Sequence, residues 1–268
     1  MKRTSLPIAL TIAGSDSGGG AGVQADLITF TALGCHGTTA ITCVTAQNPK
    51  GVSGIQPIRA DIVRKQIESV FAELPPRAVK TGMLFSTEII RTVAEFFEHQ
   101  NRPPLIVDPV MIATSGAVLL KSSAIRALKS YLLPLAMLIT PNLDEAKLLV
   151  GRNLSTVEQL KHAALELHER HGCAVLLKGG HLKLRSEAID VFYDGSVMCE
   201  LEAKRIRGVS THGTGCTYSA AVTAHLARGE KLLTATELAK QFITTAISES
   251  YKAGKHSVLN HRANKRAG

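Results

Sequence analysis

The sequence predicts an α/β protein whose mostly parallel sheet is covered by helices on both faces. Short β-branched or apolar runs alternate with longer helical patterns from Pro7 to Gly180, and such alternation is typical of crossover units that place parallel strands side by side. After Gly180 the pattern changes to strand-like runs on either side of Asp194 and Gly195, which predicts an antiparallel hairpin at one edge. The 268 residues contain no Pro/Gly-rich linker and no internal repeat, so we expect one domain over residues 1–268.

The expected strands and helices follow one another in pairs along the chain. A strand precedes a helix in the pairs 7–13 and 21–34, 38–45 and 60–74, 77–83 and 86–100, 104–111 and 122–133, and 136–141 and 144–151. A helix at 156–170 comes before a strand at 173–180, and its apolar residues recur at spacings of three and four, which indicates one buried face. The basic tail from about Ala253 to Gly268 is expected to be disordered.

Composition and charge argue against several classes of protein. Hydrophobic residues make up 45% and charged residues 20% of the chain, the balance of an ordinary globular protein. The net charge of +9 lies largely at the two ends, and the chain has no Trp for base stacking, so nucleic-acid binding is disfavoured. The apolar runs are shorter than the roughly 18 to 20 residues of a membrane helix, and a signal peptide is not recognisable, so we expect a cytoplasmic protein without membrane contact. The five cysteines form no CxxC pair, which predicts reduced thiols.

A glycine-rich segment, GSDSGGGAGVQAD from Gly14 to Asp26, directly follows the first expected strand. Glycines allow the backbone to approach a ligand closely, so this turn from strand to helix is a candidate binding edge. The segment fits neither the phosphate-binding loop of nucleotide hydrolases nor the dinucleotide-binding fingerprint. A tight turn that only packs the helix against the sheet is the alternative.

A second segment, THGTGCTYSAA, places two glycines and a cysteine where a loop is expected to become a helix. If the helix begins here, the peptide N–H groups of Gly213, Thr214, Gly215 and Cys216 are free donors, and the helix dipole adds positive potential. Such a nest suits the charge that develops on a moving phosphoryl group. The alternative for Cys216 is a small residue that only caps the helix.

A third segment, TPNLDEA, holds Asn142 and Glu145 three residues apart, on one face of a helical turn. An amide beside a carboxylate suits hydrated Mg²⁺ on nucleotide phosphates. The alternative is a helix start in which Asn142 is the cap and Asp144 and Glu145 favour the dipole. Lys178 ends a strand next to two glycines, where it is either a phosphate contact or a surface lysine.

Several blocks together resemble one known family. The blocks are ALTIAGSDSGGGAGVQADL, TCVTAQNPKGV, KTGML, VDPVMIATSGAVLL, LITPNLDEAKLL, LLKGGH and STHGTGCTYSAA. In this order, over about residues 8–230, they are similar to the hydroxymethylpyrimidine/phosphomethylpyrimidine kinases of thiamine biosynthesis, which belong to the ribokinase-like superfamily. The joint occurrence of the blocks is far more specific than any one of them.

The resemblance implies a ribokinase-like three-layer α/β/α sandwich and a kinase that uses ATP and Mg²⁺. Its expected substrates are 4-amino-5-hydroxymethyl-2-methylpyrimidine and then the monophosphate of this alcohol, and the expected assembly is a homodimer. For the nucleotide we assign Asp108, Asn142, Glu145, Lys178 and Thr211. Glu145 and Asp108 are the expected Mg²⁺ ligands, partly through water.

The resemblance also implies the residues that bind the pyrimidine. Gln47 corresponds to the family residue that reads the ring, and a glutamine amide can complement an amino group beside a ring nitrogen, as it does on adenine. The other positions assigned to this pocket are Gly14, Asp26, Met83 and Val110. The chain departs from many relatives in reading GSDSGG for GSDPSGG, and in Thr114 for a lysine, which puts a phosphate contact at that position in doubt.

Ribokinase-like sugar kinases usually have an aspartate at the place of Cys216, where it accepts the proton of the substrate hydroxyl. A helix N-terminus is expected to lower the pKa of the Cys216 thiol and so raise its thiolate fraction. Our hypothesis is that Cys216 takes the proton of the hydroxymethyl group in the first phosphorylation. The second acceptor is an ionised phosphate, for which no base is required.

Three other functions stay open at this stage. Pyridoxal kinase on the same scaffold is the nearest, because pyridoxal also carries a hydroxymethyl group on a six-membered ring; Gln47 and Cys216 favour the aminopyrimidine. A covalent cysteine enzyme with His212 as its base would leave the glycine-rich and Asn142/Glu145 segments unexplained. A pyrimidine-binding protein without catalytic activity would bind the ligand but turn over no ATP.

Overall fold

The computed structural model describes residues 5–99, 102–112, 119–180, 182, 187–207 and 212–262. Thr114 and Thr211, which the sequence analysis singled out, lie outside these residues.

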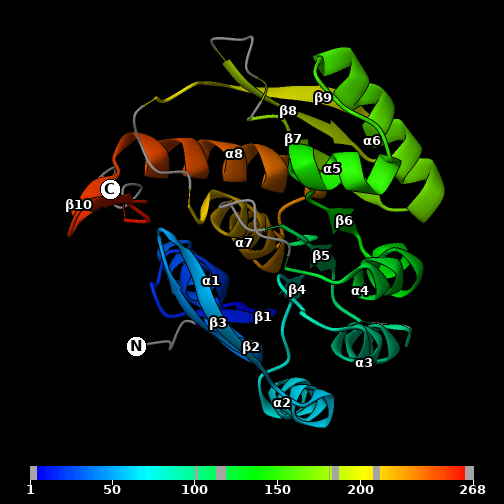
Figure 1. Ribbon diagram of the computed structural model, residues 1–268, viewed down its shortest axis with the longest axis vertical. Coiled ribbons are helices and arrows are strands. Elements are labelled where there is room, and N and C mark those ends of the chain that lie inside the picture. Colours follow the sequence, from blue (N-terminus) through cyan, green and yellow to red (C-terminus); the bar gives the residue numbers. More distant parts are fainter. Residues whose placement is uncertain are drawn as a thin grey trace.

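Within the described ranges, one nine-stranded sheet runs through the molecule in the order β3-β2-β1-β4-β5-β6-β7-β8-β9 (Figure 1). The strands are β1 (Ile8–Asp16), β2 (His36–Asn48), β3 (Gly51–Pro57), β4 (Ala78–Thr81), β5 (Leu105–Val107), β6 (Leu138–Ile139), β7 (Ala174–Lys178), β8 (Glu187–Tyr193) and β9 (Met198–Lys204). The pairs from β2 through β1 to β7 are parallel, and β8 and β9 form the predicted antiparallel hairpin. The antiparallel strand β3 at the opposite edge was not predicted.

Helices cover both faces of the sheet, as the alternation of strand and helix predicts. One face carries α2 (Ala60–Glu73), α3 (Thr87–Phe97), α4 (Ser122–Ala127), α5 (Leu143–Val150) and α6 (Val157–His171). The other face carries α1 (Gly22–Ala32), α7 (Thr214–Ala227) and α8 (Leu232–Ser248) (Figure 1). The expected three-layer α/β/α sandwich is therefore confirmed.

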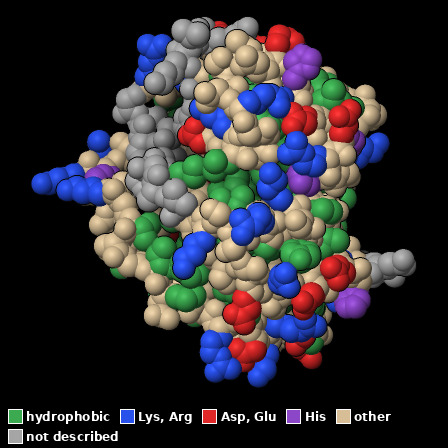
Figure 2. Space-filling view, turned by 45° about the vertical axis from the view of Figure 1, so that its right-hand side comes forward, with side chains coloured by type: hydrophobic (Ala, Val, Ile, Leu, Met, Phe, Trp, Pro, Cys, Tyr) green, Lys and Arg blue, Asp and Glu red, His purple; other side chains and the backbone are tan. Residues whose placement is uncertain are grey.

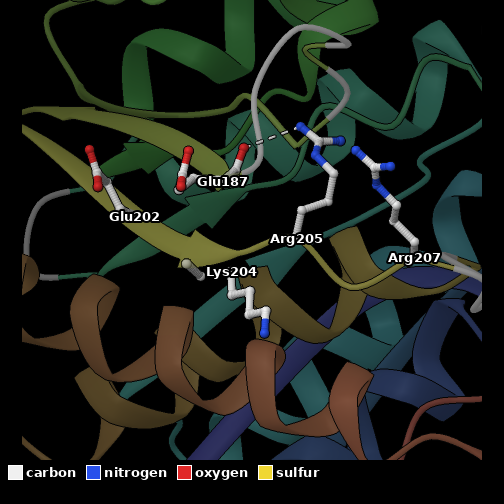
Figure 3. A pocket seen from close by; sticks show the side chains of 6 residues that line it. Glu187, Glu202, Lys204, Arg205 and Arg207 are labelled. Atoms are coloured by element: carbon white, nitrogen blue, oxygen red, sulfur yellow. Dashed lines mark hydrogen bonds between the residues drawn. The ribbon is translucent and has the colours of Figure 1, made fainter.

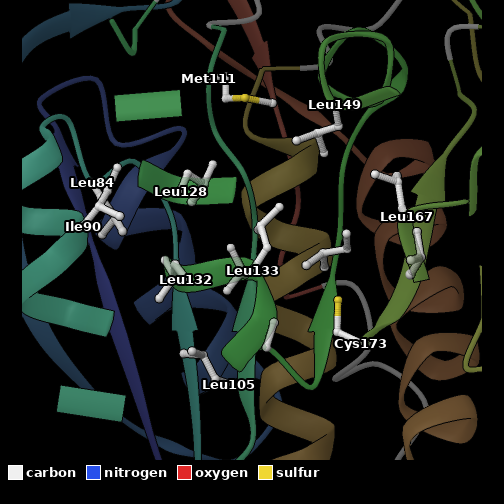
Figure 4. Close-up of a cluster of buried hydrophobic side chains, with 14 of the residues drawn as sticks. Leu84, Ile90, Leu105, Met111, Leu128, Leu132, Leu133, Leu149, Leu167 and Cys173 are labelled. Carbon is white, nitrogen blue, oxygen red and sulfur yellow. The ribbon is translucent and has the colours of Figure 1, made fainter. Parts of the chain in front are cut away.

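Two hydrophobic clusters hold the layers together, because successive strand residues point to opposite faces. Leu10 and Val79 face the cluster under α2 to α6, whereas their neighbours Ala9 and Ala78 face the cluster under α1, α7 and α8. Figure 4 shows part of the first cluster, where leucines after α4 pack between the sheet and the neighbouring helices. Each fully buried leucine of this kind contributes about 1.5–3 kcal/mol through removal of its surface from water.

The direction of strand order changes at β1, which has β2 on one side and β4 on the other. At such a switch point the connections leave toward opposite faces and open a crevice at the carboxyl ends of the strands. α1 starts at Gly22, just after the carboxyl end of β1, and α7 packs against α1, β1 and β4. The fold thus brings the start of α1 and the carboxyl ends of β1 and β4 to the same edge.

Residues 251–262 have a defined structure, which corrects the expectation of a disordered tail for residues 253–262. β10 (Tyr251–Ala253) pairs with β11 (His256–Val258), and Leu259 is buried in the second cluster. Nε2 of His261 lies 3.0 Å from Oγ1 of Thr217 in α7. A basic, aperiodic tail looks disordered in sequence because these anchoring contacts are tertiary.

No helix in the described part of the chain is long and apolar enough to cross a membrane. On the face shown in Figure 2, Lys and Arg side chains are interspersed with Asp and Glu side chains. On this face the basic side chains are not gathered in a single stripe.

Candidate active site

The loop after β1 is folded around the carboxylate of Asp16. Its oxygens accept hydrogen bonds from the backbone N–H groups of Gly18 at 2.8 Å, Gly20 at 3.2 Å and Ala21 at 2.8 Å. Burial works against the charge of Asp16, but the bond from His212 and the loop amides hold its pKa below the usual value. Asp16 was not predicted from the sequence, although an Asp before a run of glycines is a signal for such a turn.

The glycine-rich loop is joined to the segment before α7. Nε2 of His212 lies 3.1 Å from Oδ2 of Asp16, and Gly213 packs against the carbonyl of Gly20. Two segments almost two hundred residues apart in sequence therefore form one wall of the site.

α7 begins at Thr214 with Gly213 as its N-cap, as the sequence predicts. The N–H of Thr217 closes the first turn on the carbonyl of Gly213 at 2.9 Å. The amides of Thr214, Gly215 and Cys216 precede that bond and point toward the start of the helix. Oγ1 of Thr214 is buried without a hydrogen-bond partner among the described residues, so this end of the helix offers polar groups to a ligand.

Cys216 lies half-buried in the first turn of α7, and the backbone N–H of Gly22 favours its thiolate form, which by itself lowers its pKa. Burial raises the pKa of the thiol to about 11; the charge of Lys80 lowers it, whereas Asp26 and Asp108 raise it. The expectation that the helix N-terminus would lower this pKa is wrong. Burial disfavours the thiolate more than the helix dipole favours it. The nearby carboxylates of Asp26 and Asp108 raise the pKa further.

Asp26 and Lys80 form a buried ion pair beneath Cys216. Asp26 projects from α1 with no exposed surface, and its two oxygens accept bonds from Nζ of Lys80 at 2.9 and 2.8 Å. Oγ1 of Thr11 donates to the same carboxylate at 2.6 Å. The Asp26 assigned to the pyrimidine pocket thus has its oxygens engaged below the surface of the site.

Gln47 lies at the carboxyl end of β2, against the glycine-rich loop. Its backbone N–H donates to Oγ of Ser17 at 2.8 Å. Its side-chain oxygen lies 3.1 Å from Oγ1 of Thr45, whose hydroxyl donates to the Ser15 carbonyl at 2.7 Å. A register shift between Ala46 and Gln47 accompanies this arrangement. The structure therefore places Gln47 beside the glycine-rich loop, with its backbone bonded to Ser17 of that loop.

Gly14 and Met83 are neighbours across β1 and the end of β4. A Cβ built on Gly14 would stand 2.8 Å from Sγ of Cys43 and 3.1 Å from Cε of Met83. Val110 is partly buried, two residues beyond Asp108, and its N–H donates to the Asp108 carbonyl at 2.8 Å. These side chains are apolar groups close to strand ends, as a ring-binding pocket requires.

Asp108 follows β5 and collects donors from three other elements. Oδ1 accepts bonds from Nζ of Lys178 at 2.9 Å and Oγ1 of Thr140 at 3.0 Å, and Oδ2 accepts one from Oγ of Ser219 at 3.3 Å. Burial disfavours its charge, but Lys178 and Lys80 hold the pKa of Asp108 below its ordinary value. Lys178 is thereby shown to be an ion-paired residue with a side chain only 11% exposed, not a surface lysine.

Asn142 caps α5 in a capping box, so the helix-start interpretation is confirmed. Oδ1 of Asn142 accepts bonds from the N–H groups of Asp144 and Glu145, and Oε2 of Glu145 accepts one from the N–H of Asn142 at 2.9 Å. Burial raises the pKa of Glu145 to about 8; Lys178 lowers it and Asp108 raises it. Glu145 thus belongs electrostatically to the same cluster as Asp108 and Lys178.

Asp108 and Glu145 supply hard oxygen donors of the kind that Mg²⁺ prefers. Across the described residues, no group of three or more His, Cys, Asp or Glu side chains is arranged to hold a metal ion. A hydrated Mg²⁺ needs only one or two protein carboxylates when phosphates and water complete its shell. The charge of Asp108 adds to burial in raising the pKa of Glu145, and two neighbouring carboxylates of this kind fit the cation.

A groove of about 620 Å³ lies elsewhere, beside the β8–β9 hairpin (Figure 3). It is lined by Glu187, Glu202, Ala203, Lys204, Arg205 and Arg207. The guanidinium of Arg205 donates to the carbonyls of Gly180, Leu182 and Glu187. This groove is at the far end of the sheet order from β1 and contains none of the assigned residues, so we place the chemistry at the crevice and not here.

Lys80 is the second residue of the site to which the sequence alone assigned no role. It occupies the strand sequence AVKT, in which every residue is buried. A lysine inside such a strand is itself the signal, since buried lysines require a partner.

The fold and the grouped residues define a phosphoryl-transfer enzyme, in which a helix N-terminus, a lysine and buried carboxylates meet at the carboxyl edge of a parallel sheet. A family model described as phosphomethylpyrimidine kinase matches residues 16–261. The chain belongs to this kinase family.

Curated relatives carry consistent names. The hydroxymethylpyrimidine/phosphomethylpyrimidine kinase of Bacillus subtilis is 44% identical over 263 residues, which cover 98% of this chain and 97% of that protein. The enzyme of the same name from Rhizobium meliloti is 49% identical and covers 90% of each chain. The match to the thiamine biosynthesis bifunctional protein of Geobacter sulfurreducens is 46% identical, but this chain spans only 51% of its length.

The similar solved structures share this fold, but they are kinases of two different substrates. Phosphomethylpyrimidine kinase from Clostridium difficile is 43% identical with a TM-score of 0.79, over 90% of this chain and 98% of that one. An ADP complex of Bacillus subtilis pyridoxal kinase is 39% identical with a TM-score of 0.90, over 98% of this chain and 100% of that one.

Proposed function

We propose that this protein phosphorylates 4-amino-5-hydroxymethyl-2-methylpyrimidine with ATP, first to the monophosphate and then to the diphosphate, in thiamine biosynthesis. The observation that supports the proposal is that the glycine-rich loop contacts both Gln47, through Ser17, and Gly213, the N-cap of the helix that carries Cys216. Membership of the phosphomethylpyrimidine kinase family supports the same substrate.

Gln47 reads the aminopyrimidine in this proposal. Its side-chain oxygen accepts a hydrogen bond from the exocyclic amino group of the pyrimidine, and its amide nitrogen donates one to the adjacent ring nitrogen. Two hydrogen bonds between the Gln47 backbone and Oγ of Ser17 hold the residue in place in advance, which reduces the entropy that binding must remove. The apolar faces and edges of the ring contact Gly14, Met83 and Val110. Asp26 does not contact the ring directly, because its carboxylate is buried in the ion pair with Lys80.

The phosphates of ATP lie between α7 and the cluster around Asp108. The amides of Gly213 to Cys216 stabilise the phosphoryl group in transit, as preorganised donors do where charge develops. Lys178 donates to phosphate oxygens, and Asn142 and Thr211 approach the nucleotide. Asp108 and Glu145 would hold Mg²⁺, partly through water, and the cation would neutralise charge on the phosphates.

Cys216 takes the proton of the hydroxymethyl group as its thiolate. The raised pKa of the thiol makes the thiolate a minor form at neutral pH. A small population suffices because phosphoryl transfer passes through a loose transition state, in which positioning and charge stabilisation dominate and the acceptor proton leaves late.

The test is mass-spectrometric detection of the mono- and diphosphorylated pyrimidine from purified protein, ATP and Mg²⁺. Omission of Mg²⁺ should abolish both products. Absence of both products with bound pyrimidine detectable by calorimetry would instead support a binding protein without catalysis.

Pyridoxal is the second candidate substrate, because pyridoxal kinases are among the similar solved structures. The same assay with pyridoxal in place of the pyrimidine alcohol separates the two. We expect the ratio kcat/KM to favour the aminopyrimidine, since only that ring satisfies both groups of the Gln47 amide.

We further propose a cytoplasmic homodimer that binds neither nucleic acid nor membrane. The reduced cysteines and the small, anionic co-substrate suit the cytoplasm. Light scattering of the purified protein tests the dimer, and a mass of one chain, 28.6 kDa, would contradict it.

A further inference from the structure

Strand β2 contains a β-bulge directly opposite Gly14. The pairing of β1 with β2 shifts register between Ala13 and Ser15. Two residues of β2, Thr42 and Cys43, therefore stand opposite the single residue Gly14 of β1. Such bulges bend a strand and redirect its side chains, and they are frequent beside active sites. Because Gly14 is assigned to the pyrimidine pocket, the bulge lies where the ring would bind.

The hydroxyl of Thr42 reaches from this bulge to the segment that follows β4. Oγ1 of Thr42 donates to the carbonyl oxygen of Met83 at 2.6 Å, although β1 lies between β2 and β4 in the sheet. Gly14 makes this close approach possible, since a Cβ built there would stand 2.8 Å from Sγ of Cys43 and 3.1 Å from Cε of Met83. Thr42 has no exposed surface, so water does not compete for the bond.

The backbone is strained just beyond Met83. Phe85 has φ of +66°, and among the described residues it is the one residue other than glycine with a positive φ. The N–H of Ser86 donates to the carbonyl of Leu84 at 2.8 Å and closes a tight turn around Phe85. A turn of this kind is rare, and it persists only where the surrounding structure holds it in place. Backbone strain clusters at ligand sites, and here it lies in the same short segment as Met83.

Met83 is the part of this segment that a ligand can reach. Gly82 is joined to the sheet, because its N–H donates to the Ile12 carbonyl at 3.0 Å, and Leu84 is buried in the first hydrophobic cluster. Met83 between them is only partly buried. A methionine side chain is flexible, so by itself it would adapt to ligands of several shapes. The bond from Thr42 fixes the backbone from which this side chain projects.

We propose that Thr42 is a positioning residue that sets the ring specificity of the pyrimidine pocket. Its hydroxyl holds the Met83 carbonyl, so that the Met83 side chain forms a fixed apolar wall beside Gly14. Without this bond the wall becomes mobile and accepts other six-membered rings, such as that of pyridoxal, more readily. Thr42 is fully buried and does not itself contact the substrate. The inference rests on the proposed function, and it deepens that function by naming a residue that selects the ring.

The kinetic experiment uses Thr42→Val, which keeps the shape of the side chain and removes its hydroxyl. We expect KM for the pyrimidine alcohol to rise on the order of fivefold, because Met83 is then in place for only part of the time. Both kcat and KM for ATP should change by less than about twofold, since the chemistry and the nucleotide site are untouched. The ratio of kcat/KM for the pyrimidine to kcat/KM for pyridoxal should fall. Thr42→Ser keeps the hydroxyl and should restore the wild-type KM.

A methyl NMR experiment follows Met83 directly, in protein without ATP or pyrimidine. The chain has five methionines, and the Met83 signal is identified by its loss in Met83→Leu. In the wild type we expect the order parameter of the Met83 methyl group to resemble that of Met111, which is fully buried, and not that of Met137, which is 41% exposed. Thr42→Val should lower the order parameter of Met83 toward the Met137 value.

Thr38→Val is the matched control for both experiments. Thr38 is a buried residue near the start of the same strand, away from the bulge, and its Oγ1 also donates to a backbone carbonyl, that of Ala9 at 3.2 Å. The control therefore reproduces the loss of a buried hydroxyl from β2 without touching Met83. Its KM for the pyrimidine and its Met83 signal should equal those of the wild type.

The inference is overturned if Met83 is as mobile as Met137 in the wild type, or if Thr42→Val leaves either the Met83 signal or KM for the pyrimidine unchanged. It is also overturned if Thr38→Val or Thr42→Ser reproduces the effects of Thr42→Val. If Thr42→Val does not fold, Thr42→Ala, which also lacks the hydroxyl, and the wild-type order parameter of Met83 decide. Because the spectra need no substrate, a failed kinase assay would refute the proposed function, while the spectra would still decide whether Thr42 fixes Met83.

Discussion

Gly213 lies directly against the carbonyl oxygen of Gly20, so closely that a Cβ built on Gly213 would overlap that oxygen. Gly213 also has φ of +81°, a conformation that side chains strongly disfavour. The N-cap of α7 and the glycine-rich loop are therefore fitted to each other through two glycines, with Asp16 and His212 joining them alongside.

Gly213→Ala is expected to separate these two segments and move the first-turn amides of α7. Preorganised donors lose most of their effect when displaced by about 1 Å, so kcat/KM should fall by at least about 100-fold. Gly229→Ala is the control, because Gly229 has φ of +95° but nothing near the added Cβ. It should cost about 1 kcal/mol of stability and leave kcat/KM unchanged. Equal activity losses in both variants would refute the importance of the Gly20 contact.

Cys216→Ala is expected to impair the first phosphorylation far more than the second. Loss of a general base costs on the order of 10²- to 10⁴-fold, whereas the phosphate acceptor of the second step is already ionised. Single-turnover assays of each step measure the two rates separately. Equal losses in both steps would show that Cys216 does not serve as the base.

The wild-type rate of the first step should depend on pH because the Cys216 pKa is raised to about 11. With the thiol neutral at pH 7, kcat/KM for the alcohol is expected to increase from pH 7 toward pH 10 as thiolate accumulates. Cys216→Ala should abolish that increase. A flat wild-type profile over this range would indicate that the proton leaves by another route.

Glu145 should make the protein less stable as pH rises. Its folded pKa of about 8 lies above the ordinary glutamate value of 4.5, so between these values the folded state holds a proton that the unfolded state has released. Stability from this group is therefore complete below about pH 4.5 and is lost as pH rises through 8, by at most about 1.4 kcal/mol per pH unit. Urea unfolding at pH 5, 6.5 and 8 should show a weaker decrease for Glu145→Gln than for the wild type. An unchanged decrease would contradict a neutral Glu145.

Gln47→Ala should raise KM for the aminopyrimidine on the order of 10- to 100-fold with little change in kcat, since the amide contacts the ring in ground and transition states alike. Gln56→Ala on β3 is the matched control, because Gln56 is exposed and its side chain bonds only locally, to the Pro57 carbonyl. A large loss of kcat in Gln47→Ala would point to a role in the chemistry rather than in recognition.

The sequence by itself determined the layered architecture and the start of α7. The alternation of strand-like and helical patterns is a local property of the sequence, and glycines before a helical pattern indicate where the helix begins. The sheet, the β8–β9 hairpin and the Asn142 cap were therefore all predictable. β3 was not, because its polar and glycine-rich sequence forms a strand only through pairing with β2. The tail to Arg262 escaped prediction for a similar reason, since Leu259 and His261 are ordered by contacts with distant helices.

Only the tertiary structure decided the electrostatics of the site. The sequence placed Cys216 at a helix N-terminus and so predicted a lowered pKa, but the buried surroundings, with Asp26 and Asp108 nearby, raise it. Lys80 and Asp16 became significant only when their partners, far away in the chain, were in contact with them. The local sequence pattern specifies which helix or strand a residue belongs to. The pKa of a side chain depends instead on its burial and on the charges that the fold brings close to it, and neither can be read from the order of residues.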